Sequence, residues 1–349
     1  MTAIAAAVPY GIAGLGQHFA QIVDETAANG ELECYYASAI KQDDPFGRLV
    51  DISITKWLFP YTPLRFSQAW QTYLGGELFA RAVAARLQRS NVFHTFSFHS
   101  LPILQQARSL GCKQLLLESA SVHVNQVRSQ QAKAFRASGM AQGWANGALQ
   151  RRTIREYDLA DAIFVTSQLT RDSFLREGIP QEKLRLRTLQ VHPRFRPGNR
   201  RPDDDVFRVV CVGSLSVLKG TTVLLDAFAR LQGQKVELTL VGGWGTRTMR
   251  RFVQAHLRRD ARIRVVPGDP LPHLQRADVC VHPSFTDGFG YAPMEALACG
   301  VPVIVTEDTG MKDHVREGEN GYVVPTGSWE AILERLEALR QHPVSVSNQ

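Results

Sequence analysis

The sequence predicts an α/β protein of two domains, each built on a mainly parallel sheet with helices on both faces. Its 349 residues exceed the roughly 250 to 300 that a single core usually serves. Short apolar strands alternate with amphipathic helical stretches in both halves, the rhythm of β-α-β units. The strands are runs of Val, Leu and Ile, as expected of strands that are buried on both sides.

The first domain is expected at residues 1–195. Its predicted elements are strands at 3–8, 32–37, 92–95, 114–117 and 162–166, a helix at 14–29, and helical patterns between the other strands. A stretch rich in Pro and Gly without apolar periodicity follows, and it predicts a linker at 196–205.

The second domain is expected at residues 206–349. Its strands are predicted at 207–212, 236–241, 263–266, 278–282 and 301–306, and its helices at 221–231, 248–257, 293–299 and 329–340. Parallel sheets of this kind bind ligands at the carboxyl ends of their strands. The strand-to-helix junctions of this domain are therefore the first places to look for a site.

The net charge of +7 is unevenly distributed, since residues 1–200 hold 23 Lys and Arg against 15 Asp and Glu. This excess either forms a solvated face or meets an anionic acceptor, a lipid headgroup or a membrane surface. No aromatic-basic pattern or known module indicates a nucleic-acid partner.

Several absences point to a cytoplasmic location, with a peripheral place at the inner membrane face as an extension of it. No apolar run approaches the roughly 20 residues that cross a bilayer. The apolar start, residues 3–8, lacks the basic region and cleavage site of a secretory signal. The five cysteines include no closely spaced pair, so neither a zinc site nor a disulfide framework is expected.

The first junction of the second domain, residues 212–221, combines glycines with a lysine before a helix. Gly213 and Gly220 permit close approach of the backbone, and a helix N-terminus offers free N–H groups and a positive dipole end. Lys219 adds a cation suited to a diphosphate. The alternative is that Lys219 is a loop lysine that only faces solvent. The second junction, Gly242 and Gly243, is either a phosphate loop or only a tight connection.

The third junction, residues 283–303, carries two acidic residues eight positions apart. In a phosphate-binding site, Asp287 and Glu295 would be useful for binding sugar and ribose hydroxyls, because a carboxylate accepts strong hydrogen bonds. Gly288 and Gly290 would let backbone N–H groups reach a ligand. The alternative is that Glu295 caps its own helix and Asp287 is a turn residue.

Taken together, these motifs resemble the retaining family 4 glycosyltransferases of the GT-B fold. The resemblance rests on seven motifs between residues 207 and 325: Val-Gly-x5-Lys-Gly, Val-Gly-Gly, Pro-Gly-Asp, Ala-Asp-x4-Pro-Ser, Asp-Gly-Phe-Gly-x4-Glu-Ala, Gly-Val-Pro-Val-Ile and Gly-x-Asn-Gly-Tyr-Val-Val-Pro. It implies two Rossmann-like domains that face each other across a cleft. Two departures stand out: Ser214 replaces a common Arg, and Asp287 replaces the usual Glu.

The resemblance also implies roles for individual residues. Lys219 would contact the donor diphosphate, Glu295 the ribose, and Asp287 the transferred sugar. The implied donor-binding residues are Gly14, Gly16, Gly213, Ser214, Lys219, Pro267, Gly268, Asp287, Gly288, Phe289, Gly290, Tyr291 and Glu295. The catalytic candidates are Lys219, Asp287, Glu118 and His123.

The first half resembles the family more weakly. Its glycine-rich loop, residues 11–16, would face the donor phosphates. Glu118 stands where relatives often have a His beside the reacting sugar, and His123 follows five residues later, so either could line the cleft. The acceptor-side candidates are His94, His99 and Arg128, with packing and hydrogen bonding as the alternative for the two histidines.

The function implied is transfer of a hexose from a nucleoside diphosphate sugar to a hydroxyl of a saccharide, a lipid-linked acceptor or another glycoconjugate, with retention of configuration. No metal or other cofactor is expected, because the resemblance implies none and no DxD motif stands in a suitable loop, residues 203–205 lying in the predicted linker instead. Two alternatives remain open: an inactive sugar-nucleotide-binding subunit or sensor, and a sugar-nucleotide epimerase of the same fold.

Overall fold

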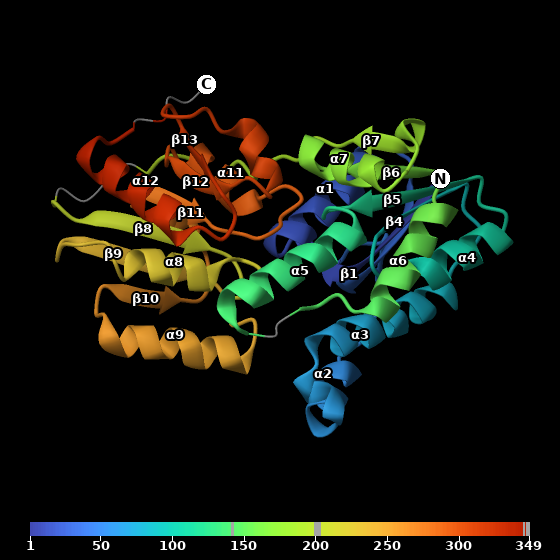
Figure 1. The fold of residues 1–349 in the computed structure, drawn as a ribbon. Coiled ribbons are helices and arrows are strands. Elements are labelled where there is room, and N and C mark those ends of the chain that lie inside the picture. The colour runs from blue at the N-terminus through green and yellow to red at the C-terminus, as the bar shows by residue number, and fades with distance from the viewer. Residues whose placement is uncertain (141–142, 199–203, 345, 347–349) are drawn as a thin grey trace. The chain divides into compact units, whose positions relative to one another are not determined.

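The computed structural model describes residues 1–140, 143–198, 204–344 and 346 (Figure 1). The chain divides into two compact units. The N-terminal unit consists of residues 1–128 and 143–190, and the C-terminal unit of residues 129–142 and 191–349. Five residues of the predicted linker, 199–203, lie outside the described residues, so the predicted domain boundaries stay predictions.

The N-terminal unit is built on a sheet of seven parallel strands in the order β3-β2-β1-β4-β5-β6-β7. The strands are β1 (Thr2–Pro9), β2 (Leu32–Ala39), β3 (Gly47–Leu49), β4 (Val92–Phe96), β5 (Gln114–Ser119), β6 (Ala162–Val165) and β7 (Leu184–Leu186). Strand order reverses between β1 and β4, the topological switch point at which open α/β sheets bind ligands.

Helices cover both faces of this sheet. They are α1 (Ala13–Ala28), α2 (Ile54–Leu58), α3 (Gln68–Ala84), α4 (Leu101–Ser109), α6 (Gly147–Leu159) and α7 (Gln168–Arg176), with short 3-10 turns η1 (Phe59–Tyr61), η2 (Pro63–Phe66) and η3 (Gln181–Lys183). Helix α5 (Val124–Ser138) begins in this unit, and its residues from 129 onward belong to the C-terminal unit. One core cluster includes Phe79 and Phe93, and a second is built around Phe19 and Tyr35. All four of these side chains are fully buried.

The C-terminal unit holds six parallel strands in the order β10-β9-β8-β11-β12-β13. They are β8 (Phe207–Val212), β9 (Val236–Val241), β10 (Ile263–Val266), β11 (Val279–His282), β12 (Val303–Thr306) and β13 (Gly321–Val324). Its helices are α8 (Thr221–Phe228), α9 (Arg247–Arg259), α10 (Leu271–Leu274), α11 (Tyr291–Ala298) and α12 (Trp329–Gln341), with the turn η4 (Gly310–His314).

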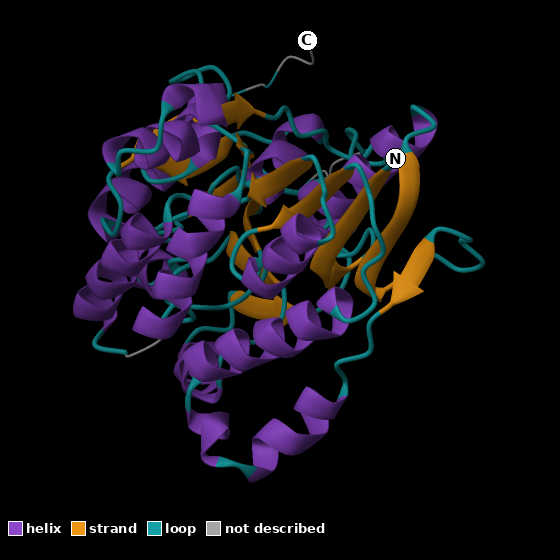
Figure 2. Cartoon of the chain, turned by 90° about the vertical axis from the view of Figure 1, so that its right-hand side faces the viewer, coloured by secondary structure: helices purple, strands orange, loops and turns teal. Residues whose placement is uncertain are grey.

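The predicted α/β class with two parallel sheets is confirmed (Figures 1 and 2). Three strands that the sequence did not predict, β3, β7 and β13, lie at sheet edges. The helix predicted from residue 293 begins earlier, at Tyr291, after Gly290, which is the N-cap residue and lies in the left-handed conformation. In the part of the chain that the structure describes, no helix combines the length and apolar character needed to cross a membrane.

Candidate active site

The loops after β8, β9, β11 and β12 meet at the carboxyl edge of the C-terminal sheet, where the sequence predicted a ligand site. The loop after β8 pairs with the loop after β9, since Leu215 N donates to Gly243 O at 2.8 Å and Gly245 N donates to Leu215 O at 2.9 Å. It also pairs with the loop after β11 through Phe285 N and Leu218 O, 2.8 Å apart. These hydrogen bonds fix the loops to one another and give the edge a defined shape.

Gly220, at the end of the β8 loop, is required by two independent features of the backbone. Its φ angle is 68°, in the left-handed region that favours glycine. A Cβ atom at this residue would lie 1.9 Å from the carbonyl oxygen of Pro283. The backbones of the β8 and β11 loops are therefore in contact at Gly220. Lys219, the residue before it, lies directly beside the β11 loop.

Lys219, Asp287 and His282 form a charged cluster at this contact. Lys219 Nζ lies 2.5 Å from Asp287 Oδ2, and His282 Nε2 lies 3.1 Å from the same oxygen. The side chain of His282 is 5% exposed, that of Asp287 19%, and that of Lys219 34%. The cluster thus runs from a buried histidine, through a shielded carboxylate, to a cation that reaches solvent.

The carboxyl group of Asp287 is held in its charged form. Burial tends to raise its pKa, but the charge of Lys219 and the hydrogen bonds from His282 and Lys219 outweigh that effect. The pKa of Asp287 therefore lies well below its usual range. An ionised Asp can only accept hydrogen bonds, which suits it to sugar hydroxyls.

The backbone of Asp287 is clamped by the loop after β12. Its N–H donates to Asp308 O at 3.2 Å, and its carbonyl accepts from Gly310 N at 2.9 Å. Because both the main chain and the side chain of Asp287 are held by neighbouring residues, its carboxylate keeps one orientation. Binding groups held in this way lose little entropy when a ligand arrives.

Helix α11 presents the remaining residues predicted on this loop. Its first residue is Tyr291, and the N-cap residue Gly290 has a φ angle of 96°. Phe289 is 5% exposed and packs its ring against Tyr291 and His314, with centroids 5.1 and 6.1 Å away. Glu295 lies in the second turn, because the helix begins at Tyr291 and not at the predicted residue 293, and it is 5% exposed.

The structure brings most of the predicted donor residues to two neighbouring strands. Gly213, Ser214 and Lys219 follow β8, and residues 287–291 follow the adjacent β11. Pro267 and Gly268 follow β10 at the far edge of the sheet. The chain just beyond them is anchored by Asp269, whose carboxylate takes two hydrogen bonds from Arg194, at 2.9 and 3.0 Å.

In the N-terminal unit, Glu118 is the centre of a buried ionic cluster at the end of β5. Its Oε1 accepts from Arg187 Nε at 2.7 Å, and its Oε2 lies 3.1 Å from His18 Nε2. His94 Nε2 lies 2.9 Å from Oε1, but its ring is not aligned for a hydrogen bond. Burial tends to raise the pKa of Glu118, yet its interactions with His18 and His94 hold the pKa well below its usual range.

Gly14 and Gly16 belong to the first turn of α1, which packs directly on the end of β1. A Cβ at Gly16 would lie 2.5 Å from the carbonyl oxygen of Pro9, and the carbonyl of Gly16 accepts from Gly11 N at 3.0 Å. This close approach places His18 of the same helix against Glu118. The glycine-rich loop and the Glu118 cluster therefore lie next to each other in the N-terminal unit.

The other candidates of this unit lie elsewhere. His123 is 3% exposed and packs on the rings of Tyr157 and Phe174, and burial lowers its pKa despite the charge of Glu177. His99 accepts from Ala7 N at 3.2 Å, and burial, aided by the charge of Arg152, lowers its pKa to about 3. Arg128 binds the side chain of Gln150.

Three residues that complete the two clusters were not predicted: His282, His18 and Arg187. His282 is the last residue of β11, and its place at a strand end next to a glycine-rich loop was a usable signal. His18 and Arg187 contact Glu118 across 100 and 69 residues of sequence, and no local pattern reveals such contacts. Among the described residues, no group of three or more His, Cys, Asp or Glu side chains is placed to hold a metal ion.

Two parallel-sheet units are the architecture of the GT-B fold, and solved structures of that fold match nearly the whole chain. Sucrose-phosphate synthase from Thermosynechococcus elongatus matches with a TM-score of 0.76 and 20% identity, over 98% of this chain and 90% of that one. WaaG, a glycosyltransferase involved in lipopolysaccharide biosynthesis, matches with a TM-score of 0.72 and 16% identity, over 98% and 91%. At these identities the likeness establishes the fold.

Sequence similarity points to a family over part of the chain. Residues 194–346 match the family described as glycosyl transferases group 1, which confirms the resemblance read from the motifs. The capsular polysaccharide biosynthesis glycosyltransferase CapM of Staphylococcus aureus is 29% identical over 167 residues, 46% of this chain and 43% of that protein. A D-inositol 3-phosphate glycosyltransferase of Rhodococcus erythropolis is 34% identical over 166 residues, 41% and 38%. The matched segments span less than half the length of these curated relatives.

Proposed function

We propose that this protein transfers a hexose from a nucleoside diphosphate sugar to an acceptor hydroxyl, with retention of configuration. The observation that carries the proposal is the Lys219–Asp287–His282 cluster, set among interlocked glycine loops within a group 1 domain. It combines a solvent-reaching cation for the diphosphate with a fixed anion for the sugar.

In this proposal the leaving diphosphate is stabilised by electrostatic preorganisation. Lys219, the N–H groups of the β8 loop and the N-terminus of α8 provide positive charge where negative charge develops. Lys219 is paired with Asp287 at 2.5 Å, so the diphosphate competes with this carboxylate for its ammonium group. His282 keeps the carboxylate in place when the lysine turns to the phosphates.

Asp287 accepts hydrogen bonds from hydroxyls of the transferred sugar. Glu295 binds the ribose, Pro267 and Gly268 flank the base, and the backbone of residues 288–291 meets the distal phosphate. These roles follow from the family resemblance and from the placement of most of these residues on β8, β11 and their loops.

The N-terminal unit contributes Gly14 and Gly16 toward the phosphates, with His123 as a catalytic candidate and His94, His99 and Arg128 as acceptor-side candidates. We assign Glu118 a positioning role, because its side chain is fully buried and bound by His18 and Arg187. The reaction proposed uses no metal or other cofactor. Turnover that disappears with EDTA and returns with a divalent cation would contradict that part.

A nucleotide-sugar donor is supported by relatives of the same fold. Structures of Anabaena Alr3699/HepE include complexes with UDP and with UDP-glucose, at TM-scores of 0.65 and 0.67 and 15% identity. The acceptor proposed is a saccharide or a lipid-linked glycoconjugate, handled in the cytoplasm. Contact with an anionic membrane through the basic N-terminal unit is part of this proposal.

A panel of UDP, GDP, ADP and TDP sugars in a thermal-shift assay tests donor binding. A ligand at 100 times its dissociation constant adds about 2.7 kcal/mol of stability. The donor identified is then incubated with acceptor pools, using wild type and Lys219→Ala. Equal turnover by the two proteins would refute the assignment of Lys219 to the diphosphate.

One observation favours a second candidate, a sugar-nucleotide-binding subunit without activity. Ser214 stands where the family commonly has an Arg, so the β8 loop has one phosphate-binding cation fewer. That candidate predicts a thermal shift with donor but neither transfer nor hydrolysis. NMR of the donor incubated alone also detects an epimerase, which would convert the sugar without an acceptor.

A further inference from the structure

The segment of residues 52–70 exposes an unusual number of large apolar side chains. We call it the aromatic segment; it contains α2, η1 and η2. In both Figure 1 and Figure 2, α2 lies at the lower edge of the N-terminal unit, away from the strands of its sheet. Its most exposed apolar side chains are Ile54 at 65%, Trp57 at 74%, Leu58 at 56%, Tyr61 at 84% and Phe66 at 79%.

The aromatic segment has a defined backbone although its described side chains contribute little to a core. Neither η1 nor η2 buries any side chain. Thr62 accepts a hydrogen bond from Leu64 N through its hydroxyl, and Gln71 Nε2 donates to Leu64 O at 2.8 Å. The main chain is thus fixed locally, and it presents the apolar side chains outward. Exposed apolar patches of this kind commonly mark interaction sites.

The charge of the segment has one sign. The sequence contains no Asp or Glu between residues 52 and 76, whereas it contains Lys56 and Arg65. The guanidinium group of Arg65 lies over the ring of Phe66, 4.6 Å from its centroid. Arg65 therefore brings a positive charge to the surface that exposes the ring of Phe66.

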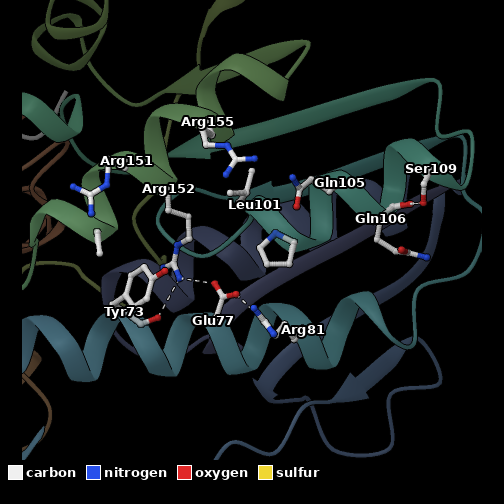
Figure 3. Close-up of a pocket in the computed structure, with 12 residues that line it drawn as sticks. Tyr73, Glu77, Arg81, Leu101, Gln105, Gln106, Ser109, Arg151, Arg152 and Arg155 are labelled. Carbon is white, nitrogen blue, oxygen red and sulfur yellow. Dashed lines mark hydrogen bonds and ion pairs between the residues drawn. The ribbon is translucent and has the colours of Figure 1, made fainter.

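A chain of aromatic contacts joins this segment to a basic pocket. Trp70, which is 45% exposed, meets the ring of Tyr73 edge-on at 5.7 Å, and the guanidinium group of Arg152 lies 4.5 Å from the Tyr73 centroid. Tyr73 and Arg152 line a pocket of about 810 Å³ between α3, α4 and α6 (Figure 3).

The pocket carries an excess of arginines. Its lining holds four, Arg81, Arg151, Arg152 and Arg155, against the single acid Glu77. The carboxylate of Glu77 is already shared by two of them, Arg81 Nε at 2.8 Å and Arg152 at 3.0 Å. Arg151 and Arg155 of α6 lie on the opposite side of the pocket from α3 (Figure 3).

We propose that the aromatic segment inserts into the interfacial layer of an anionic lipid bilayer, with the pocket arginines toward the headgroups. Trp and Tyr favour the membrane interface, where one end of the side chain is apolar and the other wet. Peripheral attachment typically combines apolar insertion with a basic surface. The inference rests on the membrane contact in the proposed function, not on the transfer reaction, and it names the segment responsible.

Vesicle sedimentation of the full chain tests this. The vesicles are phosphatidylcholine with phosphatidylglycerol, or phosphatidylcholine alone, and wild type binds the anionic ones. The triple variant Trp57→Ser, Tyr61→Ser, Phe66→Ser lowers the partition coefficient by more than about tenfold, because several apolar side chains no longer leave water. Leu186→Ser is the matched control, since Leu186 is 60% exposed on β7 of the same unit.

The pocket is tested by the double variant Arg151→Gln, Arg155→Gln. Each cation near an anionic surface contributes about fivefold to partitioning, so loss of the pair is expected to lower it by about 25-fold. The control is Arg89→Gln, another exposed arginine of the N-terminal unit. Transfer to a water-soluble acceptor stays unchanged in the triple variant, which shows that the fold is intact.

Three outcomes overturn the proposal. If wild type and the triple variant bind anionic vesicles equally, the membrane contact stands but the aromatic segment is not its basis. If wild type does not bind them at all, the membrane contact itself is refuted, whatever the transfer assay shows. If ultracentrifugation finds a wild-type dimer that the triple variant converts to monomer, with vesicle binding unaltered, the segment is a self-association surface.

Discussion

Lys219 Nζ lies 2.5 Å from Asp287 Oδ2, so the cation proposed for the diphosphate is bound to the carboxylate proposed for the sugar. The two residues are 68 positions apart and meet because the β8 and β11 loops touch at Gly220 and Pro283. A donor that carries both a diphosphate and a sugar can satisfy both side chains at once. Under the proposed function, the ion pair would therefore favour the complete donor over either fragment.

Replacing Lys219 by Ala should weaken the use of the donor. A hydrogen bond to a charged group contributes about 1.5 to 3 kcal/mol, so kcat/KM should fall by about 10- to 100-fold. Lys219→Arg should restore part of it. The matched control is Lys235→Ala, because Lys235 also binds an aspartate, Asp205 at 2.8 Å, but at the surface. Equal effects of the two alanine variants would contradict the assignment.

Asp287→Asn should affect binding of the nucleoside diphosphate and transfer of the sugar in different ways. The variant keeps the shape of the side chain but no longer neutralises Lys219, so a nucleoside diphosphate without sugar should bind as tightly as before or more tightly. Transfer should fall by about 100-fold, since a charged acceptor to the sugar is lost. Calorimetry with the diphosphate and a transfer assay give the two readings. A parallel loss of both would argue that Asp287 only maintains the loop.

A further prediction concerns how kcat/KM depends on pH. The pKa of Asp287 is depressed, so its carboxylate is already ionised above about pH 4 and should add no limb to kcat/KM between about pH 5 and 9. Comparing wild-type and Asp287→Asn profiles measures this. A limb near neutral pH that disappears only in Asp287→Asn would show that this carboxyl group titrates during turnover.

Gly220→Ala should destabilise the C-terminal unit by more than about 2 kcal/mol. The left-handed conformation alone costs roughly 1 to 2 kcal/mol for a residue with a Cβ, and the contact with Pro283 adds to it. Gly243→Ala is the control, because a Cβ there meets no atom within 4 Å. Urea unfolding of both variants provides the comparison, and similar midpoints would mean that the loops can move apart without cost.

Glu118→Gln should destabilise the N-terminal unit by about 3 kcal/mol at neutral pH, because Arg187 loses a buried counter-charge. The sign of the pH dependence follows from the depressed pKa. The stabilisation is present above the unfolded value of about 4.5 and is lost as pH falls toward the lower folded value. Wild type should therefore lose stability below that pH more steeply than the variant. The exposed control Glu182→Gln should behave like wild type.

The central strands could be predicted from sequence because they are continuous apolar runs, and residues 207–212 and 236–241 match β8 and β9 to the residue. The edge strands β3 and β7 could not, since each has three residues and includes exposed ones. The glycines and charged residues of the loops indicated the carboxyl edge of the C-terminal sheet as the place of the candidate site. The partners of Glu118, His18 and Arg187, were not predictable, because they come from elements that are distant in the sequence and meet only through packing.

The hydrogen bonds that join the β8 loop to the β9 and β11 loops limit how such a site can diversify. An insertion in any one of these loops would break its pairing with the others, so changes in loop length are costly here. Single side-chain replacements that leave the backbone in place, such as those at Ser214 and Asp287, remain open. A change in donor preference is therefore expected to arise by point substitution and to leave the outline of this sheet edge unaltered.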